Sequence, residues 1–191
     1  LKSLKLQGNL LGNGAAVDAV KKVGNQLTQG SRYHYQWFVM RDDAINAFAV
    51  PSGIIVVNSG LLKKADSANE LAAVLAHEVQ HVERRHALKN MLNSAGVASV
   101  VLMVLGDANA VMMVIAQQVS SQYFSRQVEV EADLKGAELL NQKHIDASGM
   151  VSFFKKMDAA YKDTEDNSVP DWLSSYPETL ARIKFAEQFV K

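Results

Sequence analysis

The stretch His77-Glu78-Val79-Gln80-His81 lies inside the run Glu70 to Arg85, whose composition predicts a single helix. Four residues advance an α-helix by about 400°, so His77 and His81 project from one face, one turn apart. Two imidazoles at this spacing can share a Zn²⁺ ion, and the carboxylate of Glu78 between them can activate a bound water. This stretch therefore predicts a metal-dependent hydrolytic site on a helix.

The residues just before this motif, Leu71 to Ala76, are apolar on every side of the expected helix. A helix that is apolar all round is enclosed by protein rather than laid on its surface. Burying two imidazoles and a carboxylate without partners would cost several kcal/mol, on the order of the penalty for one buried charge. A bound metal ion removes this penalty. The alternative is a partly exposed helix in which the motif arose by chance.

The composition sets limits on size and partners. With 191 residues, 48% of them hydrophobic, the chain can bury a substantial core, and we expect one domain over residues 1–191. Twenty basic and 20 acidic residues are mixed along the sequence, so no charged surface favours nucleic acid. There is no cysteine, which leaves His, Asp and Glu as metal ligands. This absence fits an oxidising compartment and does not exclude the cytosol.

Two features bear on membranes. The chain starts at Leu1 without a leader, so we expect that an export signal or an anchor was removed upstream. The segment 95–116 is strongly apolar, but Gly106-Asp107-Ala108-Asn109 interrupts it after roughly ten residues, against the ~20 that span a bilayer. Two buried helices joined by a turn are therefore expected, and a surface resting on lipid is the alternative.

The first third of the chain predicts a helix followed by short strands. Apolar residues recur at helical spacing from Asn13 to Gln29, while Tyr33 to Met40 is aromatic and β-branched. Asn46 to Val50 and Gly53 to Val57 read as two extended runs separated by Pro51, which cannot donate to a strand ladder. Such an edge strand can bind a peptide by adding a strand, whereas an ordinary hairpin packed on the helices is the equal alternative.

Helices are expected again in the second half of the chain. Residues 125–133 run into a helix ending near Leu140, and further helices are expected at Ala147 to Tyr161 and Pro177 to Val190. The acidic loop Asp163 to Pro170 between them is rich in turn-forming residues. The pattern as a whole predicts an α+β fold, predominantly α-helical, with a small β-sheet beside the helix that carries the motif.

A third metal ligand is expected on the helix after residue 125. Glu129 and Asp133 are four residues apart and share a face, so one can coordinate the ion while the other accepts the remaining N–H of a histidine ligand. Glu131 is turned by about 200° from Glu129 and should point away from the ion. A solvated acidic cluster on a helix surface is the alternative interpretation.

Two residues near the motif receive structural interpretations. Glu70 is expected to form a capping box with Ser67 rather than to bind metal, since it lies ~10 Å along the helix axis from His77. His86 comes five residues after His81, which in a continuous helix turns it about 140° away from that residue. We therefore expect His86 to be structural.

Three separated motifs together resemble the zinc metallopeptidases of the HtpX and CAAX-prenyl-protease type, peptidase family M48. The resemblance covers roughly Asp42 to Ile183 and is nearest to compact bacterial envelope members of the family. It is carried by the helix from Glu70 to His81 with Arg85-His86, by Asn46-Ala47-Phe48-Ala49 with Gly53, and by Ser125-Arg126 with Glu129, Ala132 and Asp133.

The resemblance implies a gluzincin-like catalytic domain and a role for each motif residue. It implies that His77, His81 and Glu129 hold one Zn²⁺, that Glu78 is the catalytic base, and that Asp133 orients a histidine ligand. It further implies that Asn46 and Ala47 hold the substrate main chain. Family members commonly carry a His before a late Pro, whereas this chain has Tyr176 before Pro177, with a phenol that can donate to an oxyanion.

These expectations define a zinc-dependent endopeptidase that cleaves unfolded or misassembled polypeptides in the bacterial cell envelope, most simply the periplasm. Association with the membrane would come from a missing N-terminal anchor or from the apolar segment 95–116. The sequence leaves the oligomeric state open. A zinc-stabilised holdase that binds unfolded chains without cutting them is the alternative function.

Overall fold

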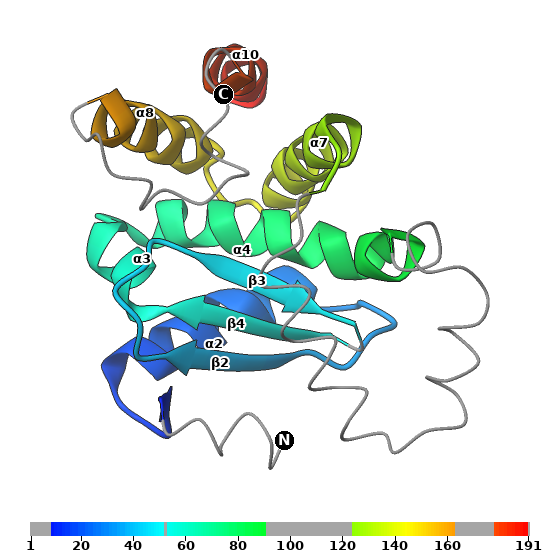
Figure 1. Ribbon diagram of the computed structural model, residues 1–191. Coiled ribbons are helices and arrows are strands. Elements are labelled where there is room, and N and C mark those ends of the chain that lie inside the picture. The colour runs from blue at the N-terminus through cyan, green and yellow to red at the C-terminus, as the bar shows by residue number, and fades with distance from the viewer. Residues whose placement is uncertain (1–8, 52, 91–123, 163–177, 191) are drawn as a thin grey trace.

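The computed structural model describes residues 9–51, 53–90, 124–162 and 178–190 (Figure 1). Helices predominate in these ranges, beside one small sheet, as the sequence predicted. The elements are β1 (Leu10–Leu11), α2 (Ala15–Thr28), β2 (Gln36–Met40), β3 (Ala47–Val50), β4 (Ile54–Asn58), α3 (Ser59–Lys64), α4 (Ala68–Glu83), α7 (Arg126–Gln142), α8 (Ser148–Lys162), α10 (Glu178–Ala186) and the 3₁₀ turn η1 (Glu187–Phe189).

The four strands form a mixed sheet in the order β1-β2-β4-β3. Strands β2 and β4 are parallel, whereas β1 pairs with β2 and β3 pairs with β4 in antiparallel fashion. Strand β3 therefore lies at one edge of the sheet, where the sequence predicted an edge strand, and it packs on α4. Pro51 follows β3 directly, outside the strand ladder.

Strands β3 and β4 are buried on both faces of the sheet, and alternate residues of each strand point to opposite faces. On one face Val39, Ala49 and Ile55 join the main core together with α2 and α4. On the other face Val50 and Val56 join a second cluster. That cluster also contains Ala87 and Phe124. Strands buried on both faces read as continuous apolar runs, which is why β3 and β4 were visible in the sequence.

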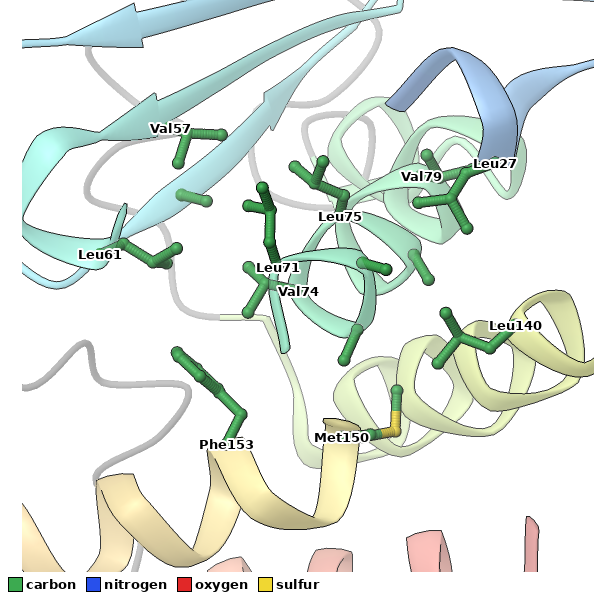
Figure 2. Close-up of a cluster of buried hydrophobic side chains, with 14 of the residues drawn as sticks. Leu27, Val57, Leu61, Leu71, Val74, Leu75, Val79, Leu140, Met150 and Phe153 are labelled. Atoms are coloured by element: carbon green, nitrogen blue, oxygen red, sulfur yellow. The ribbon is translucent and has the colours of Figure 1, made fainter. Parts of the chain in front are cut away.

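Helix α4 runs through the middle of the molecule, between the sheet on one side and α7 and α8 on the other (Figure 1). All residues from Glu70 to Val82 are buried. Figure 2 shows that Leu71 and Leu75 of α4 lie within a cluster to which the sheet, α2, α7 and α8 also contribute. The prediction of an enclosed helix is confirmed, so every polar group on α4 must find its partner inside the protein.

The N-terminus of α4 carries the predicted cap in a modified form. The backbone N–H of Glu70 donates to Ser67 Oγ at 3.2 Å, as a capping box requires. The Glu70 carboxylate accepts from the backbone N–H of Asp66 at 2.8 Å instead of from that of Ser67. It also accepts from Ser152 and Lys156 of α8, so the cap fastens α4 to a second helix.

The C-terminus of α4 differs from the prediction of one helix up to Arg85. The helix ends at Glu83, and Arg85 adopts a left-handed conformation with φ of 56°. Helical conformation resumes at His86 with a new direction. The expected 140° rotation of His86 away from His81 assumed an unbroken helix and is therefore wrong.

No helix in the described part of the chain is long and apolar enough to cross a membrane. The apolar segment 95–116 and the acidic loop Asp163 to Pro170 both lie outside the described residues. The expectations about two buried helices and about a lipid-facing surface therefore stay predictions.

The contact between α4 and α7 depends on one small residue. A Cβ atom placed on Gly136 of α7 would lie 3.2 Å from the backbone nitrogen of His77 and 3.4 Å from the backbone carbon of Ala76. The missing side chain lets the two helix backbones approach closely. The approach occurs beside the residue that begins the His-Glu-Val-Gln-His motif, so it also sets the distance across the candidate site.

We expect Gly136→Val to lower the free energy of unfolding by about 1–3 kcal/mol, because the added side chain overpacks this contact. Urea denaturation followed by circular dichroism measures the change. Lys135→Val is the matched control, since it places the same β-branched residue on the same helix at a partly exposed position. A Gly136→Val protein as stable as this control would contradict the role assigned to the close approach.

Candidate active site

Two helices bring three ligand-type side chains together. His77 and His81 come from α4, and Glu129 comes from the first turn of α7. The two Nε2 atoms are 3.0 Å apart. Glu129 Oε2 lies 3.3 Å from Nε2 of His77, and Glu129 Oε1 lies 3.8 Å from Nε2 of His81. Two ligand atoms that each lie ~2.1 Å from a tetrahedral ion are about 3.4 Å from each other. The three separations measured here lie on both sides of that value. The cluster can therefore hold a metal ion.

The bonding of Glu129 also fits a cation at this position. The side chain is largely buried, and its Oε2 atom makes no hydrogen bond to the described residues. Leaving a carboxylate oxygen buried without a partner is costly. A positive ion held by Glu129 and the two imidazoles would satisfy this oxygen.

The second nitrogen of His77 is held by a buried ion pair. Nδ1 of His77 lies 2.9 Å from Asp133 Oδ1, and Asp133 is 1% exposed. Arg182 of α10 donates to both oxygens of Asp133, at 2.5 Å and 2.8 Å, and its guanidinium lies over the ring of Phe154. The predicted pairing of Asp133 with a histidine is thus present in the structure. Sequence reasoning assigned Arg182 no role at this site.

The second nitrogen of His81 faces another histidine. Nδ1 of His81 lies 3.1 Å from Nδ1 of His86, a residue that is 2% exposed. The ring of Phe124 stacks on His81 with the centroids 4.4 Å apart. Sequence reasoning missed this contact because it depends on the helix break at Arg85.

Glu78 is buried beside the cluster and next to the edge strand. Burial, followed by the charge of Glu129, raises its pKa to about 8, although the charge of His77 and a backbone hydrogen bond from Ala49 oppose the rise. The Ala49 N–H lies on β3, so the carboxylate sits between the ligand cluster and the sheet edge. A carboxyl group whose pKa is near neutrality can exchange protons with a reacting group at physiological pH.

In the metal-free chain, the pKa values of the two histidines on α4 are shifted in opposite directions. Burial by itself lowers the pKa of His77, but its hydrogen bond with Asp133 and its close contact with the carboxylate of Glu129 outweigh burial and raise that pKa to about 10. Burial, followed by the positive charge of His77 and by the nearby His86 and Arg182, holds the pKa of His81 well below its usual range. Metal binding must therefore displace a proton from His77.

A cavity opens next to His81 where β3 ends. Its volume is about 250 Å³. The walls are mainly apolar, and one cationic side chain lies at the rim. The cavity is lined by residues of β3 and of the end of α4, among them Ala49, Val50, Pro51, His81, Val82 and Arg85.

The structure brings most of the predicted site residues to one place. His77, His81 and Glu129 cluster together, Asp133 is bonded to His77, and Glu78 is adjacent to the cluster. Glu131 lies outside the ligand cluster, as its position on the helix predicted, and is bonded to Arg84 and His86. Asn46 and Ala47 lie at the start of β3. Tyr176 falls outside the described residues.

A helix that carries two histidines and a glutamate in this order, completed by a carboxylate from a second helix, defines the HExxH class of metallopeptidases. The sequence model described as Peptidase family M48 matches residues 16–190. The chain therefore belongs to this family and is a metalloprotease. Its family implies a metal ion, and the described residues offer the cluster of His77, His81 and Glu129 to hold one.

Curated relatives agree with this assignment. The beta-barrel assembly-enhancing protease of Yersinia pestis is 28% identical over 183 residues, which cover 87% of this chain and 37% of that protein. The mitochondrial metalloendopeptidase OMA1 of Schizosaccharomyces pombe is 29% identical over 164 residues, covering 82% and 47%. The metalloprotease LoiP of Escherichia coli is 32% identical over 144 residues, covering 71% and 55%. The chain thus spans only part of the length of each relative.

The stability of the metal-free protein should fall as the pH rises from 6.5 to about 9. The folded chain binds protons more tightly than the unfolded chain at His77 and at Glu78, whose ordinary pKa values are 6.5 and 4.5. Their contributions are complete below those ordinary values and are lost as the pH passes toward about 10 and about 8. The pKa values of His81 and Asp133 are lowered, so these two groups change the stability only at pH values below this window.

Urea midpoints measured in the presence of a chelator test this expectation. The zinc-saturated protein is the control, because an ion on His77 replaces the proton there and should weaken or reverse the dependence. A chelated protein whose midpoint stays constant or rises over this window would show that the buried cluster is not protonated as described.

Proposed function

We propose that the chain is a zinc-dependent endopeptidase and that His77, His81 and Glu129 hold the zinc ion. The observation that supports this proposal most directly is the convergence of these three side chains on one point, with the buried carboxylate of Glu78 beside it. Two imidazoles and a carboxylate form a donor set that suits zinc, and zinc held by three protein ligands would be able to bind a water or the substrate. The proposed catalytic unit is a single domain over residues 1–191.

In the proposed reaction, Glu78 handles the proton. Zinc bound at this site would supply Lewis-acid polarisation of the scissile carbonyl and would acidify the attacking water. Glu78 takes the proton of that water and then delivers it to the leaving amine. Its enclosed position suits both steps, because burial keeps its pKa close to neutral pH and keeps bulk water from exchanging the proton. Asp133 and Arg182 keep the ring of His77 oriented throughout.

The edge of β3 that pairs with no other described strand is the proposed place for the substrate main chain. The backbone N–H of Asn58 donates to the carbonyl of Asn46, and Ala47 is in register with Val57. Because pairing alternates along an antiparallel ladder, the polar backbone groups of Ala47 and Ala49 point away from β4 toward the open edge. A peptide that adds a strand here passes Glu78 and the ligand cluster. We propose that Asn46 and Ala47 begin this docking edge.

Unfolded or misassembled polypeptides are the proposed substrates. Main-chain pairing at a sheet edge ignores side-chain identity but requires an extended segment, which folded proteins seldom offer. The relatives include proteases named for β-barrel assembly in bacteria, which supports a proposed location in the bacterial cell envelope.

The prediction that Tyr176 donates to the oxyanion is part of the same proposal, and Tyr176→Phe removes only the hydroxyl in question.

Glu78→Gln should keep the zinc ion and abolish the cleavage of casein. The amide is isosteric with the carboxylate but cannot accept the proton, so we expect a loss of at least about 100-fold in rate, the scale of general-base catalysis. Zinc content measured by atomic absorption, together with fragment formation on gels, separates binding from chemistry. Glu138→Gln is the matched control, because it makes the same change on the surface of α7.

The same assay distinguishes the peptidase from a holdase. A zinc-loaded parent chain that binds unfolded casein for days without producing fragments would favour the non-proteolytic function. Retained cleavage in Glu78→Gln would instead leave the enzyme assignment intact and remove Glu78 from the role of base.

A further inference from the structure

We propose that His86 and Glu131 are positioning residues that fix the ring of His81 for metal binding. The inference rests on the zinc site proposed above. It concerns a side of the site that the three ligands and their base leave unexplained, namely the nitrogen of His81 that points away from the metal position.

The two histidine ligands receive different outer partners in this structure. His77 meets a carboxylate directly, since Asp133 lies 2.9 Å from its Nδ1. Among the described residues, no carboxylate bonds the second nitrogen of His81; this nitrogen faces His86 at 3.1 Å. Nε2 of His86 then lies 3.4 Å from Glu131 Oε2. A carboxylate thus supports each ligand, but it reaches His81 through an inserted imidazole.

Only one arrangement of hydrogens satisfies this series of contacts when His81 binds a metal. A neutral imidazole that uses Nε2 as a ligand must carry its hydrogen on Nδ1. That hydrogen points at Nδ1 of His86, which must accept it. His86 then carries its own hydrogen on Nε2 and donates it to Glu131. The negative charge of Glu131 therefore selects, through His86, the tautomer that leaves Nε2 of His81 free for metal.

The carboxylate at the end of this series is itself held in place. Arg84 donates from Nη1 to Oε1 of Glu131, which leaves Oε2 to face His86. Arg84 is the C-cap of α4, and the left-handed residue after it redirects the chain so that His86 faces back toward His81. The helix break therefore places Arg84 against Glu131 and His86 against His81.

The surroundings restrict His81 to this orientation. The ring of Phe124 stacks on His81 at 4.4 Å and lies 6.2 Å from the ring of His86. Both histidines are nearly fully buried, so water does not compete for their nitrogens. A role in packing alone would need only the volume of the His86 ring. A positioning role needs an acceptor at the place of its Nδ1 atom.

A pair of substitutions separates these two roles. His86→Leu fills much of the volume but offers no acceptor, whereas the side-chain oxygen of His86→Asn falls near the place of Nδ1. Glu131→Gln removes the charge at the end of the series and keeps an acceptor. Glu131 is half exposed, so this variant does not depend on the tolerance of the core. Glu138→Gln on α7 is the matched control for Glu131→Gln.

The measurement is the zinc affinity of the full chain, obtained by competition with a chromophoric chelator, together with the visible spectrum of the Co²⁺-loaded protein. We expect His86→Leu to bind zinc about 10–100-fold more weakly than the parent and to show an altered cobalt spectrum. His86→Asn should recover most of the affinity. Glu131→Gln, one step further out, should lose up to about 10-fold, while Glu138→Gln should match the parent.

The outcomes are distinguishable from a failure of the proposed function. A parent chain that binds no zinc overturns the metal site and this inference with it. A parent that binds zinc tightly, with His86→Leu of equal affinity or with His86→Asn as weak as His86→Leu, overturns the positioning role alone. If His86→Leu does not fold, Glu131→Gln decides, because an affinity equal to that of Glu138→Gln removes the carboxylate from the series.

Discussion

The enclosure of α4 is the constraint on which the rest of the structure depends. A helix that is buried from Glu70 to Val82 cannot leave its two imidazoles and its carboxylate to water. Their partners come from helices far along the chain, through Glu129 and Asp133 of α7 and through Arg182 of α10. The same helix contacts therefore form the core and position the residues of the site. The close approach of α7 to α4 at Gly136 contributes to both.

Much of this arrangement was predictable from local pattern. The burial of α4, the edge position of β3 and the shared face of Glu129 and Asp133 follow from periodicity, from Pro51 and from helix geometry. The left-handed turn at Arg85 does not follow, because nothing in the residues around it marks a helix end: neither glycine nor proline is present there. His86 was misplaced for that reason. Arg182 was missed because pairing across the fold leaves no local trace.

The site combines fixed and accessible parts. The nitrogens of His77 and His81 that point away from the cluster both face buried partners, which fixes the orientation of the two rings. The edge of β3 and the cavity beside His81 offer approach from one side. Glu78 lies where these parts meet, bonded to the backbone of the edge strand.

The dependence of Asp133 on Arg182 has a consequence for biosynthesis. During synthesis the N-terminal end of the chain leaves the ribosome first, so α4 emerges well before α10. Until Arg182 has emerged and docked, Asp133 lacks its counter-charge, and the network around His77 is incomplete. The network of His77, Asp133 and Arg182 therefore forms only after α10 has been synthesised. The active site is then assembled late, after most of the chain has had time to fold.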